Sequence, residues 1–148
     1  MPYLTGRLTP IGAVVDVLIG VSTQRKKLLV KNGLPVPNPS HVRSLIDTGA
    51  TVSGFASRVF RELGLTPATR INVLTPSTPH DAPHLCAFYD VSLQLVAEGR
   101  PHQFLESRVM AADCWPPGDR IEGLLGLDIL NHCFFQFVGK DRTFTFAF

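Results

Sequence analysis

The feature that most constrains the fold is a two-residue alternation of apolar side chains that recurs along the chain. In the segment 13–19 every odd-numbered residue is apolar, and in 143–148 phenylalanines alternate with smaller residues. Because successive side chains of a strand point to opposite faces, this period predicts β-strands. The chain also contains 12 prolines and 12 glycines, many of them between such segments. The sequence therefore predicts an all-β barrel or sandwich built from many short strands.

Turn signals divide the chain into further elements. One helix is expected over 56–65, because its apolar residues fall near helical spacing, Gly64 suits the C-terminal cap and Pro67 follows. A short helical turn is expected over 129–132, and the proline-rich segment 33–40 is expected to be an extended surface loop. The expected strands are 13–19, 27–31, 42–48, 70–75, 87–96, 103–111, 133–138 and 143–148.

Composition limits the class of protein. No linker or low-complexity segment interrupts residues 1–148, so a single domain is expected. The formal net charge is +2 and the basic residues are scattered, which argues against nucleic acid or an anionic membrane as the main partner. The longest apolar stretch, 11–21, contains Asp16 and is shorter than the roughly 20 residues of a bilayer-spanning helix. No secretory signal is evident near the N-terminus, and the three irregularly spaced cysteines are expected to be reduced, as in a cytoplasmic protein.

The sharpest local signal is the segment Ser44–Ala50, in which Asp47 follows an apolar strand and precedes Thr48 and Gly49. A carboxylate held at such a turn can exchange protons in catalysis. The same tripeptide also fits a plain Asx-turn, in which the aspartate accepts backbone N–H bonds and the glycine supplies a positive φ. Taken alone, the motif leaves both interpretations open.

A second segment, Ile121–Leu130, favours the catalytic interpretation. It places two leucines before Gly126, and a glycine lets one segment pass close beside another because it has no Cβ. An Asp-Thr-Gly-Ala loop followed by such an apolar-apolar-glycine segment resembles the retroviral-type aspartic proteases, the retropepsins. The resemblance covers Val14–Phe148 and implies a closed acid-protease barrel with one or two short helices, assembled as a homodimer. The helix at 56–65 resembles the cellular and bacterial relatives more than the compact viral enzymes.

The resemblance also implies roles for individual residues. Asp47 matches the catalytic aspartate, Thr48 the residue whose hydroxyl braces two active-site loops across the dimer axis, and Gly49 the glycine beside bound substrate. The segment 73–85 matches the flap, a hairpin that closes over substrate, although it carries three prolines and no glycine. The residues expected to contact substrate are Ala50, Thr51, Thr75, Ser77 and Leu125.

A homodimer is expected because peptide hydrolysis of this kind needs two carboxylates that share a proton around one water molecule. The chain holds one Asp-Thr-Gly, so a two-fold axis would have to supply Asp47 twice. Tyr3–Leu8 and Phe144–Phe148 match the terminal strands that interleave between retropepsin subunits, and a strand with an all-phenylalanine face invites pairing with another chain. The alternative is that the C-terminal strand lies inside its own barrel.

The predicted function is therefore an aspartic endopeptidase that acts on polypeptide and needs no cofactor. One alternative is a retropepsin-like dimer that binds peptide without cutting it, which the glycine-free flap favours. A purely structural barrel would not explain why both motifs are present. His80, His84 and Cys86 have a zinc-like spacing but lack a fourth ligand, so no metal is expected. Asp128 is expected to be a structural group at the start of the short helix.

Overall fold

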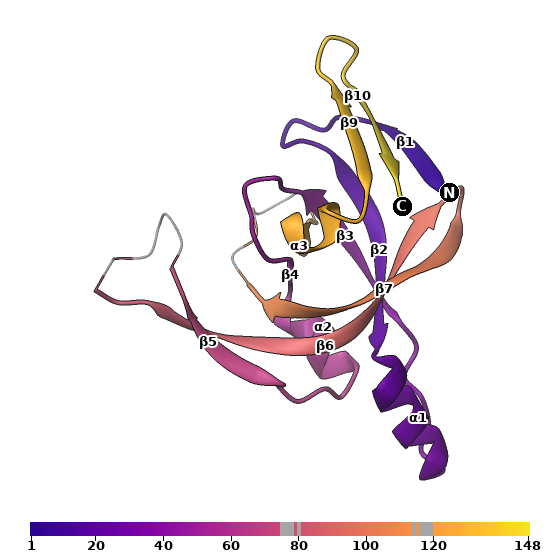
Figure 1. The fold of residues 1–148 in the computed structure, drawn as a ribbon, viewed down its shortest axis with the longest axis vertical. Helices are drawn as coiled ribbons and strands as arrows, with labels where there is room; N and C mark the ends of the chain where they lie inside the picture. The colour runs from indigo at the N-terminus through magenta and orange to yellow at the C-terminus, as the bar shows by residue number, and fades with distance from the viewer. Residues whose placement is uncertain (75–78, 80, 114, 116–119) are drawn as a thin grey trace.

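A computed structural model describes residues 1–74, 79, 81–113, 115 and 120–148. The described residues form ten strands and three helices (Figure 1). The strands are β1 (Tyr3–Arg7), β2 (Val14–Val21), β3 (Ser40–Ile46), β4 (Gly54–Phe55), β5 (Thr69–Val73), β6 (His84–Ala97), β7 (Arg100–Ala111), β8 (Gly123–Leu125), β9 (Phe134–Val138) and β10 (Thr143–Ala147). The helices are α1 (Thr23–Lys31), α2 (Ser57–Glu62) and α3 (Leu127–Leu130). Within this described part of the chain, no helix has the length and apolar content needed to cross a membrane.

Six strands close into a barrel. The larger sheet has the order β2-β3-β8-β4-β7-β6-β5, and β2 also pairs with β6, which leaves β5 outside the ring as a partner of β6 alone. Across the closing pair, Val17 lies opposite Leu95 and Ile19 opposite Leu93, and all four side chains are buried. The alternation in 13–19 is thus the core-facing side of β2, and the expected all-β closed barrel is confirmed.

A second, three-stranded sheet joins the two ends of the chain in the order β1-β10-β9. Phe144 and Phe146 of β10 are buried in the core of the same chain. Gly6 makes room for this packing, since a Cβ at Gly6 would lie 2.6 Å from the Phe144 ring. This is the arrangement of the alternative expectation, in which the C-terminal strand lies inside its own barrel: β10 has a partner strand on each edge, whereas β1 pairs with β10 alone among the described residues.

Helix α1 corrects a second expectation. Residues 27–31 were expected to form a strand but lie in α1, so the described chain has three helices rather than one or two. Two caps outside the apolar pattern hold the helix: the Ser22 side chain accepts a hydrogen bond from the Arg25 N–H, and the Glu106 carboxylate of β7 accepts from the N–H and hydroxyl of Thr23. Leu29 is the buried residue of this helix, which projects from one end of the barrel (Figure 1).

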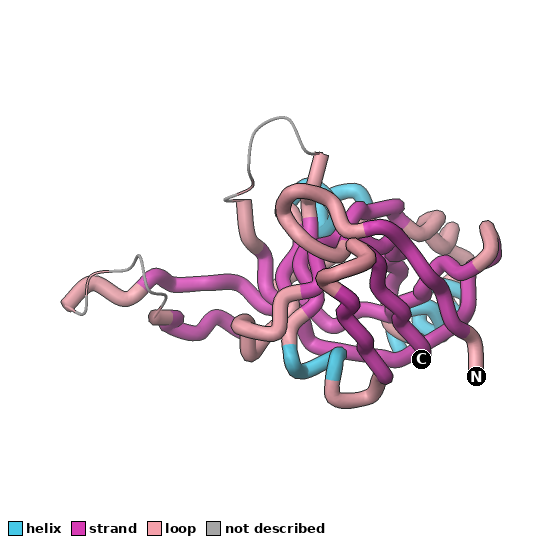
Figure 2. Tube along the Cα trace, turned by 90° about the horizontal axis from the view of Figure 1, so that it is seen from above, coloured by secondary structure: helices cyan, strands magenta, loops and turns pink. Residues whose placement is uncertain are grey.

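Strands β5 and β6 form a hairpin that extends away from the barrel (Figures 1 and 2). Its register places Thr69 opposite Phe88 and Val73 opposite His84. The expected flap segment, 73–85, falls at the free end of this hairpin, and its residues 75–78 and 80 lie outside the described part.

Candidate active site

Asp47 lies directly after β3, at the start of a tight loop. Its N–H donates to the Leu125 carbonyl at 3.0 Å, and its own carbonyl accepts from the Ala50 N–H at 3.3 Å. Its carboxylate oxygen Oδ1 accepts from the Gly49 N–H at 2.9 Å. The Asx-turn is therefore present, and it fixes the direction of a carboxylate that remains half-buried rather than enclosed.

Strand β8 lies beside this loop and is hydrogen-bonded to it. It pairs in parallel with β3, with Leu125 opposite Ile46, and in antiparallel with β4, with Leu124 opposite Gly54. Gly126 follows at the point of closest approach, where a Cβ would lie 2.8 Å from the Ala50 carbonyl oxygen. The two sequence motifs are thus adjacent in space, and the glycine is required by backbone crowding.

A partly buried polar cluster joins the loop to α3. The Ser53 hydroxyl accepts from the Gly126 N–H at 2.8 Å and donates to Asp128 Oδ1 at 2.7 Å. The Asp128 carboxylate also accepts from the N–H groups of Ser53 and Ile129 at 3.0 Å. Asp128 is therefore a structural group in the first turn of α3, as expected. Ser53 was not singled out from the sequence, where nothing distinguishes it from other serines.

The expected site residues are distributed as follows. Thr48, Gly49 and Thr51 are exposed on the loop, beside Asp47, and Ala50 is half-buried. The carbonyls of Ala50 and Thr51 accept from the first N–H groups of α3. Thr75 and Ser77 lie outside the described residues.

Leu125 does not fit the substrate-contacting role expected for it. Its side chain is fully buried in the core, so no substrate can reach it. Its carbonyl accepts the Asp47 N–H instead, and Leu125 therefore positions the aspartate through the backbone.

An ion-pair network behind the site joins α2 to the segment that enters β8. The Arg58 guanidinium binds the Glu122 carboxylate and also Glu62, whose carboxylate accepts from the Ser40 hydroxyl at 2.9 Å. The hydrogen bond from Arg58 lowers the pKa of Glu122, and hydrogen bonds from Ser40 and then Arg58 lower the pKa of Glu62. The hydrogen bonds from Arg58 to Glu122 and then to Glu62 raise the pKa of Arg58. The sequence did not predict this network, because its partners are 18 to 64 residues apart along the chain. The exception is the pair Arg58 and Glu62, four residues apart in one helix.

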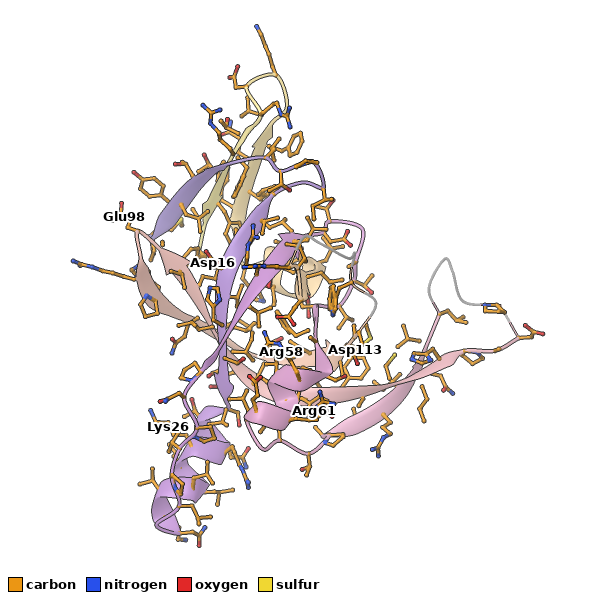
Figure 3. The ribbon with its side chains drawn as sticks, turned by 180° about the vertical axis from the view of Figure 1, so that it is seen from behind. Asp16, Lys26, Arg58, Arg61, Glu98 and Asp113 are labelled. Atoms are coloured by element: carbon orange, nitrogen blue, oxygen red, sulfur yellow. The ribbon has the colours of Figure 1, made fainter. Side chains whose placement is uncertain are left out.

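Asp113 supplies the cap that α2 lacks locally. One carboxylate oxygen accepts from the Ser57 N–H at 2.9 Å and the other from its hydroxyl at 2.5 Å. These bonds, the hydroxyl bond first, lower the pKa of Asp113. Arg58, Arg61 and Asp113 gather around α2 (Figure 3).

No metal-binding group of three histidine, cysteine or acidic side chains occurs among the described residues. Of the zinc-like trio, His80 lies outside that part of the chain. Cys86 and Cys133 are free thiols, and burial raises the pKa of Cys133 to about 11.

Comparison with known proteins supports the fold. A retropepsin-like aspartic protease from Rickettsia conorii is similar over 99% of this chain and 91% of its own, with a TM-score of 0.55 and 14% identity. The simian foamy virus (mac) protease (80% and 92% covered, TM-score 0.46, 14% identity) and the EIAV protease in complex with the inhibitor HBY-793 (80% and 85%, 0.39, 19%) are less similar. No family model and no curated protein matches the sequence. On the strength of the Rickettsia structure, the chain has the retropepsin-like fold.

Proposed function

We propose that the protein is an aspartic endopeptidase, active as a homodimer in which two copies of Asp47 face each other. The observation that carries the proposal is the contact between the Asp47 loop and β8, through the hydrogen bond from Asp47 N–H to the Leu125 carbonyl and the forced glycine at 126. A turn of this kind could be formed without a crossing strand. The crossing adds rigidity where a catalytic carboxylate must be held in one direction.

The dimer is proposed because one chain supplies one such aspartate. Thr48 and Gly49 are exposed beside Asp47, so a second copy would have access to the loop. Since β10 has no free edge, the two chains would meet without exchanging their C-terminal strands. The single domain over residues 1–148 would be the repeating unit of this assembly.

In the proposed reaction, water is bound between the two carboxylates. One Asp47 accepts a proton from the water, and the other donates a proton to the carbonyl oxygen of the scissile peptide. The two carboxylates would share one proton, as this reaction requires. Gly49, Ala50 and Thr51 would contact an extended polypeptide, together with Thr75 and Ser77. The Thr48 hydroxyl would brace the two active-site loops across the dimer axis.

A second candidate is a dimer that binds peptide without cutting it. The segment 73–85 favours it, because three prolines and no glycine restrict the backbone where a flap would have to open. The free thiols of Cys86 and Cys133 fit a reducing compartment such as the cytoplasm for either candidate.

The test is cleavage of a diverse peptide pool between about pH 3 and 7, the range over which carboxylates titrate. Wild type and Asp47→Asn are compared at several protein concentrations, with circular dichroism to show that both are folded. A protease gives cleavage that requires Asp47 and rises faster than linearly with concentration. A folded dimer that binds peptides but cuts none across this range overturns the proposal in favour of the binding module.

A further inference from the structure

Helix α1 carries a local concentration of positive charge. Four of the 14 lysines and arginines of the chain fall within residues 25–31, an exception to their otherwise scattered distribution. No aspartate or glutamate occurs between Asp16 and Asp47, so no neighbour along the chain balances this charge. Glu106, at the start of the helix, accepts hydrogen bonds from Thr23. The positive charge is therefore presented on a helix that projects from the barrel, with Lys26 on it (Figure 3).

Three of these cations share one face of the helix. Lys27 and Lys31 are one helical turn apart, and Lys26 precedes Val30 by one turn, so the lysines surround Val30. Together with Thr23, these residues line a groove of about 450 Å³, called here the lysine face. The Val30 residue is 63% exposed, and no ion pair joins the three lysines to any described residue. The lysine face thus offers unpaired positive charge around an apolar centre.

This chemistry fits an acidic polypeptide segment with one apolar residue among its carboxylates. The carboxylates would pair with the lysines while the apolar side chain covers Val30. A helix that lies on a membrane gathers its apolar residues on one face. In α1 the other exposed apolar residue, Leu28, is two positions from Val30 and lies on the opposite side, beside Leu65 in a separate groove. The described lining of the lysine face also holds no aromatic ring on which nucleic-acid bases could stack.

The lysine face is remote from Asp47. Strand β3 starts at Ser40, beside the end of β2 from which α1 continues, and it ends at Ile46, directly before Asp47. Its seven residues span about 20 Å at the rise of an extended strand. A segment bound at α1 therefore does not compete with a peptide bond held at Asp47, and one polypeptide must cover at least about 20 Å to reach both.

We propose that the lysine face of α1 binds an acidic segment of the polypeptide substrate, remote from the scissile bond. The inference rests on the proposed function, because it takes the bound polypeptide to be cleaved at Asp47. The segment carries glutamates or aspartates on both sides of a residue such as leucine. Binding at α1 raises the local concentration of the scissile sequence at Asp47, so it lowers KM and leaves kcat unchanged.

Binding is measured first, with the Asp47→Asn protein so that cleavage does not interfere. The fluorescent probe peptide has a leucine with two glutamates on each side, and the comparison peptide has glutamines in their place. At about pH 6, where glutamates are ionised, the acidic peptide should bind roughly fivefold more tightly. About 0.5 M salt should remove most of this difference. Combined Lys26→Gln, Lys27→Gln and Lys31→Gln, the lysine variant, should also remove it, and glutamine keeps the helix propensity of lysine.

The matched control variant combines Arg100→Gln, Lys140→Gln and Arg142→Gln, which removes the same charge from exposed residues outside α1. Its affinity for the acidic peptide should stay within about twofold of that of the parent protein. Val30→Ala should weaken binding roughly threefold because it removes the apolar centre, whereas Leu28→Ala on the opposite side of the helix should not. Thermal unfolding shows that each variant is folded.

Cleavage then tests the link to Asp47. A cleaved peptide is joined at either end to the acidic segment by a Gly/Ser linker of about 20 residues, whose average span is about 25 Å. A linker of about three residues reaches at most about 11 Å and serves as the comparison. With the long linker, glutamates in place of glutamines should lower KM roughly fivefold at unchanged kcat in wild type, and not in the lysine variant. With the short linker they should give no gain.

The outcomes separate this inference from the proposed function. Cleavage that requires Asp47 but gains nothing from the long-linked acidic segment, or gains equally from the short-linked one, overturns the inference and leaves the proposed function standing. Equal loss of binding in the lysine variant and the control variant also overturns it, as does tighter binding to phosphatidylserine vesicles or single-stranded DNA than to the acidic peptide. If wild type cuts no peptide, the proposed function has failed. Lysine-dependent binding of the acidic peptide then still supports the lysine face as a polypeptide site, and its absence overturns that site.

Discussion

The Ser53 hydroxyl donates a hydrogen bond of 2.7 Å to Asp128, across 75 residues of sequence, and so joins the end of the Asp47 loop to the first turn of α3. The same oxygen accepts the Gly126 N–H, which places it at the centre of the crossing between the loop and β8. Ser53 is fully buried, so water cannot replace either partner. The position of Asp47 therefore depends on a residue that does not touch it.

The first prediction concerns two serines that are equally buried. Ser53→Ala should lower the free energy of unfolding by about 2 kcal/mol, because it leaves the Gly126 N–H without its acceptor and removes a bond to a charged carboxylate. Ser44→Ala is the matched control, since the Ser44 hydroxyl has no hydrogen-bond partner among the described residues and its loss should change stability by less than about 0.5 kcal/mol. Urea unfolding measures both. Equal losses in the two variants would contradict the assigned role of Ser53.

The second prediction concerns Gly126. Gly126→Ala should destabilise the fold by about 1–3 kcal/mol and reduce Asp47-dependent cleavage, because the new methyl meets backbone atoms of Ala50 and Val52 at 2.8 to 3.0 Å. Gly139→Ala is the comparison, since its methyl would meet only the exposed, movable Phe137 ring at 3.1 Å. Thermal unfolding and peptide cleavage distinguish the two. A Gly126→Ala protein with unchanged stability would show that the loop and β8 can separate without penalty.

The sequence predicted those parts of the fold in which local pattern and tertiary environment agree. The alternation in 13–19 predicted β2 because its odd-numbered residues all enter one core. The helix near 56–65 was found from its apolar spacing and from Gly64, which has a φ of +61° in the structure. The contact between the two motifs was predicted from family resemblance, because the two short motifs together imply that these distant segments of the chain lie side by side.

Other parts depended on partners that no local pattern reveals. Residues 27–31 have the composition of a short strand, and they become helical in a segment capped by Glu106 from a distant strand. The phenylalanines of β10 alternate as they would in a strand that pairs with another chain. In the structure β10 pairs with β1 and β9 of its own chain, and Phe144 and Phe146 are buried in the core. The family resemblance implied that Leu125 contacts substrate, whereas its side chain is buried in the core.

The third prediction concerns acid stability. The pKa of Glu122 is lowered in the folded protein from its ordinary value of 4.5, so its ion pair stabilises the fold above that value and the contribution is lost as the pH falls through the folded pKa. Arg58→Met should therefore lower stability at pH 7, and the difference from wild type should shrink below about pH 4.

Arg61→Met is the control for this prediction, because it removes a cation from the same helix that acts on Asp113 only through longer-range charge. Its effect should be smaller at pH 7. Urea unfolding at several pH values gives the comparison. A difference between wild type and Arg58→Met that stays constant from pH 7 to pH 3 would show that the ion pair is not the source of the stability.

The fourth prediction concerns α1, which projects from the barrel and depends on a cap from β7. In Glu106→Ala the amide hydrogens of α1 should exchange roughly fivefold faster than in wild type. The reason is that the Thr23 N–H loses its acceptor and the start of the helix loses a negative charge. Hydrogen–deuterium exchange measures this, and the barrel amides of the same sample serve as the internal control, since they should exchange as in wild type. Glu106→Gln keeps an acceptor without the charge and should give an intermediate rate. Faster exchange across the whole barrel would mean that Glu106 supports β7 itself, and an unchanged α1 would mean that Ser22 alone suffices to hold the helix.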